Sequence, residues 1–440
     1  MPATAAATSP RILIIAWEHP GVHSQRGTAL VRRIGQLARG LADMNATVTV
    51  AHRLSREDDP ARDAPVREVT PAGNTYMRHA IRGPSADALS TQWPAPIRRA
   101  ITALTVLRGG DRSAGWARLA SAYLQSGRIT RPDVIIGCFT PRAPLAVASR
   151  ASRAWDVPWI ADLQDPWWEG AGTAVRPVLA HWTRRVLRTA DLVVQVSPEW
   201  AAQTEGVTQR HVAVARHALR DDIPERAREF GTSRSGPFTI LYGGSLNEDQ
   251  QDVTPFLQGI ARLRQAGFDR ELVVDIAGTE VVWRKFHNAA VRTGVSDRLR
   301  WLGWLDSASF VERATAADCL LVIPLVEPER RGIPSKLYDY LAYGPPVLIA
   351  GPDSGGFESL MSEWQHPNVV ARSSDQVERA LHSAMRGDAS GLLSLNKCGR
   401  RPLTERGLAQ QYALWSEQLW QRVPGAFDRE TMIISPGPAT

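Results

Sequence analysis

Short apolar runs alternate with longer amphipathic stretches along most of the chain, and this alternation is typical of parallel-sheet α/β domains. The first run, Arg11–Trp17, leads through a loop into an amphipathic stretch at Thr28–Leu41. Further strand-like runs in the first half lie at Thr47–Ala51, Asp133–Phe139, Pro158–Asp162 and Asp191–Val196. Helix-like stretches lie at Ala114–Gln125, Pro144–Trp155 and His181–Thr189, whereas residues 55–130 are otherwise less regular. The pattern predicts one doubly wound domain.

The same alternation restarts after Ile223–Pro237, a charged stretch without periodicity that is typical of an interdomain linker. Predicted strands are Phe238–Tyr242, Leu272–Ala277, Leu299–Trp301, Cys319–Pro324 and Pro346–Ala350. Predicted helices are Val253–Ala266, Ser307–Ala316, Ser335–Ala342 and Leu408–Arg422. We therefore expect two Rossmann-like domains, residues 1–225 and 226–407, that face a central cleft. Residues 408–440 are expected to cross back to the first domain as a helix and to end in a disordered tail.

Composition is that of an ordinary globular protein, with 43% hydrophobic and 22% charged residues among 440. The three cysteines form no CxxC pair, which argues against a zinc site or a disulfide framework. No apolar run approaches the ~18 residues of a membrane span. The beginning of the chain lacks the basic region of a signal peptide. We expect a cytoplasmic protein.

The net charge of +7 is spread over scattered arginine pairs rather than a basic run, so no nucleic-acid partner is expected. This charge suits anionic small molecules or an anionic membrane surface. Only three lysines occur, Lys285, Lys336 and Lys397, against a large number of arginines. A lysine in this chain is therefore more informative than usual.

The most informative segment runs from Gly332 to Val347 and predicts a short helix just beyond a buried strand. Pro334 suits the first helical position, and Gly344 suits a left-handed cap. The free N–H groups of such a helix start bind anions, and Lys336 adds a full positive charge there. Helical spacing places Lys336, Asp339 and Tyr343 on one face and Leu337, Tyr340 and Leu341 on the other. The alternative is an ordinary helix with a Lys–Asp pair worth only ~0.2–0.5 kcal/mol.

This segment resembles the PxKxxEYxAxGxPV motif of GT-B glycosyltransferases, especially the retaining enzymes of family 4. In that family the motif glutamate holds the ribose of a nucleotide-sugar donor, and Asp339 stands at its position here. A second family glutamate is replaced by Arg331, which would face a phosphate instead. The resemblance implies these donor-binding residues in the segment: Arg331, Gly332, Ile333, Pro334, Ser335, Lys336, Leu337 and Asp339.

The resemblance extends over most of the chain. Phe238–Leu246 is similar to the first strand and glycine turn of the family's second domain, which implies donor contacts at Gly243, Gly244 and Ser245. The lysine that usually follows this turn is missing, so Lys336 and the Arg330–Arg331 pair are candidates to replace it. Ile276–Gly278 and Trp301–Leu305 resemble the segments that flank the base, which adds Gly278, Trp304 and Leu305 to the expected donor contacts. The alternative for Trp304 is an ordinary core or surface tryptophan, which is the more common case in a chain with 15 tryptophans.

In the first half, Trp159–Trp167 is similar to the VADFRDPW stretch of one branch of this family. Asp162 and Asp165 are therefore candidates for polar contacts near the reacting centre, and loop caps are the alternative. The long first loop carries His19 and His23 as titratable candidates. With Lys336, the expected catalytic residues are Asp162, Asp165 and His19.

The resemblance implies a retaining transfer from a UDP- or GDP-linked sugar, with no cofactor and no metal ion. The first domain would bind the acceptor, which is a small molecule (a thiol included) or a lipid-linked compound from natural-product or cell-envelope biosynthesis. Trp93–Arg112 is basic and amphipathic, as in a surface that contacts the inner membrane face or in a lid. Two alternatives remain: an inactive nucleotide-binding homologue and a nucleotide-sugar 2-epimerase. A sugar phosphorylase shares the architecture but needs a pyridoxal-bearing lysine, and none of the three lysines lies in a recognisable segment for it. The oligomeric state stays open.

Overall fold

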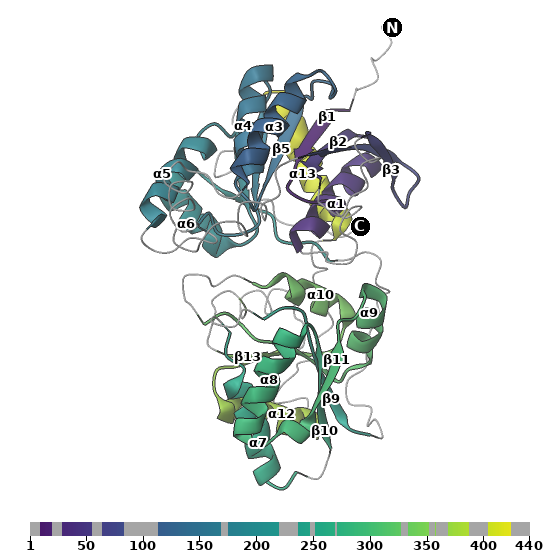
Figure 1. Ribbon diagram of the computed structural model, residues 1–440, viewed down its shortest axis with the longest axis vertical. Helices are drawn as coiled ribbons and strands as arrows, with labels where there is room; N and C mark the ends of the chain where they lie inside the picture. The colour runs from purple at the N-terminus through teal and green to yellow at the C-terminus, as the bar shows by residue number, and fades with distance from the viewer. Residues whose placement is uncertain are drawn as a thin grey trace, which may run out of the picture. The chain divides into compact units, whose positions relative to one another are not determined.

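A computed structural model separates the chain into two compact units (Figure 1). Unit 1 comprises Met1–Ala218 and Glu405–Thr440, and unit 2 comprises Leu219–Thr404. The expected boundary at residues 225 and 226 lies outside the described residues. The structure describes residues 9–19, 29–54, 64–82, 113–168, 175–219, 236–246, 251–268, 271–326, 333–351, 357, 368–386 and 404–423.

Unit 1 is built on a sheet with the strand order β3-β4-β2-β1-β5-β6-β7-β8. All neighbours are parallel except β3 and β4, which form an antiparallel hairpin. Because β1 pairs with both β2 and β5, the strand order reverses at β1, as in doubly wound sheets. The strands are β1 (Arg11–Ile15), β2 (Thr47–Arg53), β3 (Val66–Val69), β4 (Thr75–Ile81), β5 (Val134–Phe139), β6 (Trp159–Leu163), β7 (Leu192–Gln195) and β8 (Ala213–Val214).

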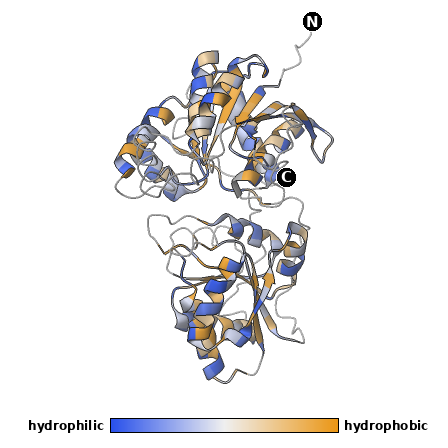
Figure 2. Ribbon diagram, viewed as in Figure 1, coloured by the Kyte–Doolittle hydropathy of each residue, from blue (hydrophilic) through white to orange (hydrophobic). Residues whose placement is uncertain are grey.

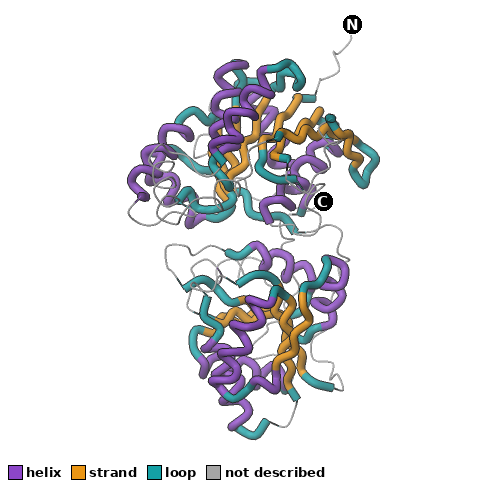
Figure 3. The backbone as a smooth tube through the Cα atoms, viewed as in Figure 1, coloured by secondary structure: helices purple, strands orange, loops and turns teal. Residues whose placement is uncertain are grey.

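Helices cover both faces of this sheet (Figure 3). Alternate strand residues such as Leu13, Ile135 and Leu163 pack into one core with α3 and α4. Asp162 lies between such positions on β6 and so points to the opposite face, where α1 and α13 lie. The helices are α1 (Ala29–Asp43), α3 (Ala114–Gln125), α4 (Ala143–Trp155), α5 (Arg176–Leu187), α6 (Pro198–Thr208) and α13 (Glu405–Trp420).

The C-terminal helix α13 packs against α1, far from it in sequence (Figure 1). Gly40 permits this close approach, because a Cβ there would lie 2.4 Å from the Cβ of Ala409. Helix α13 thus belongs to unit 1, although all of unit 2 separates it from the rest of that unit in sequence.

Unit 2 holds a six-stranded, wholly parallel sheet with the order β11-β10-β9-β12-β13-β14. One core lies between this sheet and α7, α8 and α12, and a second lies on the face of α9 and α10. In both units the central strands are largely hydrophobic (Figure 2). The strands are β9 (Phe238–Gly243), β10 (Leu272–Ala277), β11 (Leu299–Gly303), β12 (Cys319–Val322), β13 (Val347–Ala350) and β14 (Asn368–Ala371). The helices are α7 (Thr254–Gln265), α8 (Glu280–Thr293), α9 (Ser307–Ala316), α10 (Ser335–Tyr343) and α12 (Ser374–Met385), and a 3₁₀ turn spans Ser296–Arg298.

The structure adds elements that the hydrophobic pattern did not predict. Strands β3 and β4 lie within residues 55–130, where no strand was expected, and β3 alternates between half-buried and exposed side chains. Helices α6, α8 and α12 and strands β8 and β14 were also missed. None of the helices that the structure describes combines the length and apolar character that crossing a membrane requires. The amphipathic stretch Trp93–Arg112 lies outside the described residues.

Candidate functional site

Three glycine turns lie side by side at the carboxyl ends of β9, β10 and β11. The Gly244 N–H donates to the Ala277 carbonyl at 3.0 Å, and the Gly278 N–H donates to the Gly303 carbonyl at 2.9 Å. Gly244 has a φ of +108°, which side chains rarely adopt. A Cβ on Gly278 would lie only 2.9 Å from the Gly244 carbonyl oxygen. These turns therefore bring bare backbone to the edge of the sheet where ligands bind in such folds.

Lys336 extends from the first turn of α10 to the β9 turn. Its ammonium donates to the Tyr242 hydroxyl at 2.9 Å and to the Ser245 carbonyl at 3.4 Å. A Cβ on Gly244 would lie 3.3 Å from the lysine nitrogen. Burial lowers the pKa of Lys336 to about 7. Within the described part of the chain, no carboxylate pairs with Lys336, and burial is the only cause of its pKa shift.

Helix α10 is fixed to the same turn by a second tyrosine. The Tyr340 hydroxyl accepts from the Gly243 N–H at 2.9 Å and donates to the Gly243 carbonyl at 3.3 Å. Pro334 lies one position earlier than expected, at the N-cap, and Ser335 is the first helical residue. Gly344 ends the helix with a φ of +92°, which confirms the predicted left-handed cap.

Two expectations for this helix are corrected by burial. Tyr343 was placed on the polar face with Lys336, but its side chain is buried in the apolar core of unit 2. Ile333 and Leu337 were expected at the donor, but their side chains lie in the same core, as the helical spacing predicted for Leu337, so a donor contact there would involve only backbone groups. Side chains from β9, β12, β13 and α9 pack in this core, and Phe310 of α9 contacts the Tyr343 ring, so the buried face of α10 is wider than its spacing predicted. Asp339, like Lys336, keeps partial exposure.

The segment after β11 carries the expected base-contacting residues. The Trp304 side chain is 59% exposed, whereas Leu305 packs partly against the core. Trp301 donates its indole N–H to the Gly278 carbonyl at 3.2 Å and stacks on Trp283. Trp304 is therefore free of the core and stays a candidate stacking surface. Several other expected residues lie outside the described part: His23, Arg330, Arg331 and Gly332.

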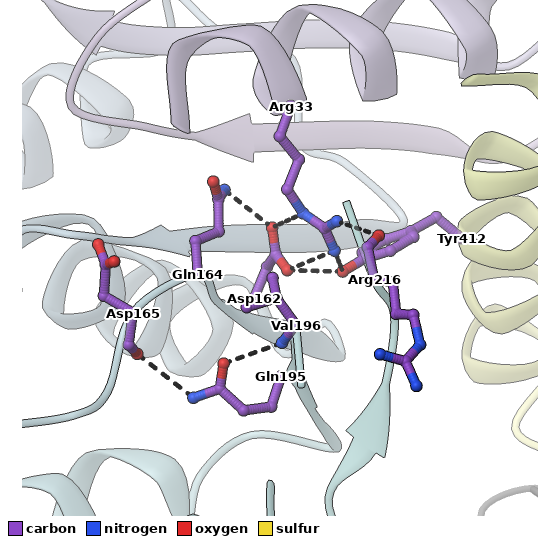
Figure 4. A network of polar contacts seen from close by, with 8 residues as sticks. All are labelled: Arg33, Asp162, Gln164, Asp165, Gln195, Val196, Arg216 and Tyr412. Carbon is purple, nitrogen blue, oxygen red and sulfur yellow. Dashed lines mark hydrogen bonds and ion pairs between the residues drawn. The ribbon is translucent and has the colours of Figure 1, made fainter. Parts of the chain in front are cut away.

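In unit 1, Asp162 belongs to a buried polar network (Figure 4). Arg33 from α1 donates to both carboxylate oxygens, at 3.1 and 3.0 Å, and also to the Arg216 carbonyl at 2.9 Å. Tyr412 from α13 donates to Asp162 at 2.7 Å and accepts from Arg33 at 3.0 Å. Gln164 donates a further bond at 3.2 Å. Asp162 has no exposed surface with which to contact a substrate, so the expected contact with the reacting centre is revised to a structural role.

The network also fixes the protonation of its members. Burial alone would lower the pKa of Arg33, but Asp162 and Tyr412 outweigh burial and raise it above its ordinary value. Burial, reinforced by Asp162, raises the pKa of the Tyr412 hydroxyl well above its usual range. Arg33 therefore stays charged and Tyr412 stays protonated at any ordinary pH.

Asp165 follows in the loop after β6 and joins three neighbouring strand ends. Its carboxylate accepts from the Thr140 hydroxyl at 2.8 Å, in the loop after β5. Its carbonyl accepts from the Gln195 amide at 3.3 Å, at the end of β7 (Figure 4). Because Asp165 is only partly buried, it remains the carboxylate of this pair that a substrate can approach.

His19 lies inside unit 1 rather than in a solvated loop. Only 1% of it is exposed, its Nε2 lies 3.1 Å from the Tyr76 hydroxyl, and its ring stacks on His52 at 5.5 Å between centroids. His52 in turn lies 3.2 Å from the Arg78 guanidinium, which pairs with Glu68. Burial raises the pKa of Tyr76 to about 12, so this hydroxyl remains neutral beside His19.

Two family models match the chain, one over each unit. A model described as a glycosyl transferase 4-like domain matches residues 28–217, and one described as glycosyl transferases group 1 matches residues 237–386. The chain belongs to the family-4-like glycosyltransferases. No curated protein sequence matches this glycosyltransferase significantly.

Solved structures share the fold of the glycosyltransferase at low sequence identity. A lipopolysaccharide outer core galactosyltransferase, WaaB, is 16% identical, with a TM-score of 0.57 and coverage of 92% of this chain and 99% of its own. A sucrose-phosphate synthase from Thermosynechococcus elongatus is 14% identical, with a TM-score of 0.57 and coverage of 94% and 98%. The HepE protein of Anabaena, solved with UDP, is 13% identical, with a TM-score of 0.53 and the same coverage. The glycosyltransferase therefore has the two-domain, Rossmann-like GT-B fold that the sequence predicted.

Four residues of the glycosyltransferase that build these sites were not singled out as site residues from sequence: Arg33, Tyr242, Tyr340 and Tyr412. Tyr242 and Tyr340 adjoin motif residues, so their positions carried a signal. Arg33 and Tyr412 carried none, because their partners are distant in sequence. Among the described residues, no group of three or more His, Cys, Asp or Glu side chains is arranged to hold a metal ion.

Proposed function

We propose that this glycosyltransferase transfers a sugar from a UDP- or GDP-linked donor to an acceptor with retention of anomeric configuration. One observation carries the proposal: the Lys336 ammonium lies at the β9 glycine turn without a carboxylate partner in the described residues. An ammonium group beside bare backbone and a helix N-terminus suits a diphosphate, whose negative charge favours the protonated lysine. The family membership and the neighbour solved with UDP support a nucleotide donor.

The chemistry needs positive charge at the leaving group. Cleavage of the sugar–phosphate bond places negative charge on the diphosphate oxygen, and a fixed cation stabilises that charge in the transition state. Lys336 supplies the cation, and the first N–H groups of α10 add their dipole. Asp339, one turn further, would accept hydrogen bonds from the ribose, and the exposed Trp304 would stack on the base. Because Lys336 supplies this charge, we propose that no metal ion is required.

Retention would follow from front-face attack, in which the leaving phosphate takes the acceptor proton as the new bond forms. This route needs no carboxylate nucleophile. This route fits unit 1, because the Asp162 carboxylate is bound by Arg33 and Tyr412 and is therefore not available as a nucleophile. Asp165 remains the candidate for orienting the acceptor, whereas His19 is as buried as Asp162 and does not contact an acceptor in this arrangement. We propose a small-molecule or lipid-linked acceptor from natural-product or cell-envelope biosynthesis.

Calorimetry tests the donor class. The full-length protein is titrated with UDP, GDP, ADP and dTDP in buffer that contains EDTA. We expect selective binding of UDP or GDP, and we expect Lys336→Met to weaken it at least tenfold. Lys285→Met is the matched control, since it removes a lysine from α8 rather than from the turn. Equal affinity in the Lys336→Met variant would contradict the site.

Turnover is tested separately. Nucleotide release from the matching nucleotide-sugar is followed with and without EDTA, and the anomeric configuration of an identified product is read by NMR. Nucleotide binding without any release or transfer would favour the inactive-homologue alternative. An inverted product would contradict the front-face mechanism while leaving the donor site intact. Flotation with anionic vesicles distinguishes the two acceptor classes. Co-flotation of the protein would favour a lipid-linked acceptor, and its absence would favour a free small-molecule acceptor.

A further inference from the structure

Tyr242 occupies an unusual place for a tyrosine, at the end of a central strand and under a charged group. Its ring is fully buried in the core of unit 2 and lies 5.0 Å from the ring of Phe286. The hydroxyl donates to the Ser245 carbonyl at 2.9 Å and accepts from the Lys336 ammonium at 2.9 Å. The ammonium also lies 4.3 Å from the centre of the tyrosine ring. The core thus fixes the ring, and the ring fixes the hydroxyl.

The hydroxyl holds the ammonium without neutralising it. A phenol has one proton, and here that proton points to Ser245, so only oxygen lone pairs face Lys336. Burial raises the pKa of Tyr242 well above its ordinary value, which keeps the group uncharged. A carboxylate in this place would compete with a bound phosphate, whereas a neutral oxygen leaves the positive charge available.

We propose that Tyr242 is a positioning residue that holds the Lys336 ammonium at the glycine turn, where the donor diphosphate binds. The inference rests on the proposed donor site. It accounts for a departure noted in the sequence, namely the absence of the lysine that usually follows this turn. A lysine from α10 reaches the same turn, and a tyrosine from β9 keeps it there.

The arrangement predicts a pH dependence of donor affinity. The groups that face Lys336 are the Tyr242 hydroxyl from β9 and the Ser245 carbonyl from the turn, and no charged group in the described residues shifts its pKa. Burial alone lowers that pKa to about 7 in the free protein. A bound diphosphate favours the charged ammonium and raises the pKa, so binding above pH 7 takes up a proton. Affinity should therefore fall as pH rises from 7 to 9. The nucleotide does not cause this fall, because its terminal phosphate ionises near pH ~6 and its charge is nearly constant between pH 7 and 9.

The test measures UDP and GDP affinity of the full chain by calorimetry between pH 6 and pH 9. Tyr242→Phe keeps the ring and removes the hydroxyl. We expect this variant to bind the nucleotide about tenfold more weakly at pH 7. Its affinity should also begin to fall at a lower pH than that of the wild type. Lys336→Met should abolish the pH dependence between pH 7 and 9. In that background Tyr242→Phe should add no further loss, because the hydroxyl then has no ammonium to hold.

Tyr123→Phe provides the control, since it removes a hydroxyl that pairs with the basic side chain of His79 in unit 1. It should leave affinity and pH profile unchanged. The inference is overturned if Tyr242→Phe matches the wild type, or if its loss persists in the Lys336→Met background. If the wild type binds no nucleotide at all, the proposed donor site itself fails, which is a different outcome.

A second measurement needs no substitution. The chain has only three lysines, so selectively ¹³C-labelled lysine gives few NMR signals. One signal should titrate near pH 7, and its titration should move to higher pH when UDP or GDP is added. Assignment follows from its loss in Lys336→Met. If all signals titrate at the ordinary pH of lysine, the ammonium is not held in the buried turn and the inference fails.

Discussion

The buried pair between Arg33 and Asp162 allows a quantitative test of what holds unit 1 together. Both side chains are fully buried, and two bonds of 3.1 and 3.0 Å join them. Removing one partner of such a pair leaves an uncompensated buried charge and costs ~3–5 kcal/mol. We therefore expect Arg33→Met and Asp162→Leu each to destabilise unit 1 by about 4 kcal/mol.

The double variant should lose less than the sum of the two. It removes both charges together, but it takes from the Tyr412 hydroxyl and the Gln164 amide their hydrogen bonds to Arg33 and Asp162, at ~1 kcal/mol for each of the two groups. Two single losses of about 4 kcal/mol and a double loss of about 2 kcal/mol give a coupling energy of roughly 6 kcal/mol.

Thermal unfolding followed by circular dichroism measures these differences. For a unit of this size 1 kcal/mol corresponds to ~2–4 °C, so each single variant should lower the unit 1 transition by roughly 8–16 °C. The double variant should lie closer to the wild type than either single variant. If its Tm fell by the sum of the two single shifts, the pair would carry no coupling and the reasoning would be refuted. Unchanged nucleotide affinity in all three variants would show that unit 2 is intact.

Further substitutions test other contacts. Gly244→Ala places a side chain on a backbone with a φ of +108° and brings its Cβ to 3.3 Å from the Lys336 nitrogen. Calorimetry should therefore show at least a fivefold loss of nucleotide affinity. An unchanged affinity would argue against the tight turn. Gly40→Val should force α13 away from α1 at Ala409 and lower the free energy of unfolding of unit 1 by ~1–3 kcal/mol, as measured by urea unfolding. Unchanged stability would mean that the two helices can shift apart without cost. Tyr412→Phe removes a hydroxyl with two buried partners, and urea unfolding should show a loss of ~1–3 kcal/mol; a difference below 0.5 kcal/mol (about the size of a surface substitution) would contradict its place in the network.

Much of the fold could be predicted from the sequence because the buried strands are locally hydrophobic. Strand β5, for example, is buried at all six positions, so its signal needs no knowledge of its neighbours. The hairpin of β3 and β4 gave a weak signal, since β3 is short and only half-buried. Helix α8 has apolar residues at helical spacing, such as Val282 and Phe286, but its remaining positions are largely polar.

In the candidate site, too, the sequence predicted the residues that lie in local motifs and missed the contacts between distant residues. The glycine turn and Lys336 carry local motifs, so the sequence predicted both. The contact between Lys336 and Tyr242 spans 94 residues, and that between Tyr412 and Asp162 spans 250. A single sequence contains no record of such distant pairs. For that reason Asp162 was expected at the reacting centre, whereas the structure buries it under α1 and α13.

The separation of α13 from the rest of unit 1 has a consequence for biosynthesis. The ribosome makes Arg33 and Asp162 early, but Tyr412 emerges only after all of Leu219–Thr404 has been translated. At 5–20 residues per second this delay is about 10–40 s. During that interval the nascent first unit exposes the apolar surface that α13 later covers, and its ion pair lacks one partner. Folding of unit 1 is therefore completed only after unit 2 has been translated, and a chain that stops before Glu405 would lack the helix that packs against α1.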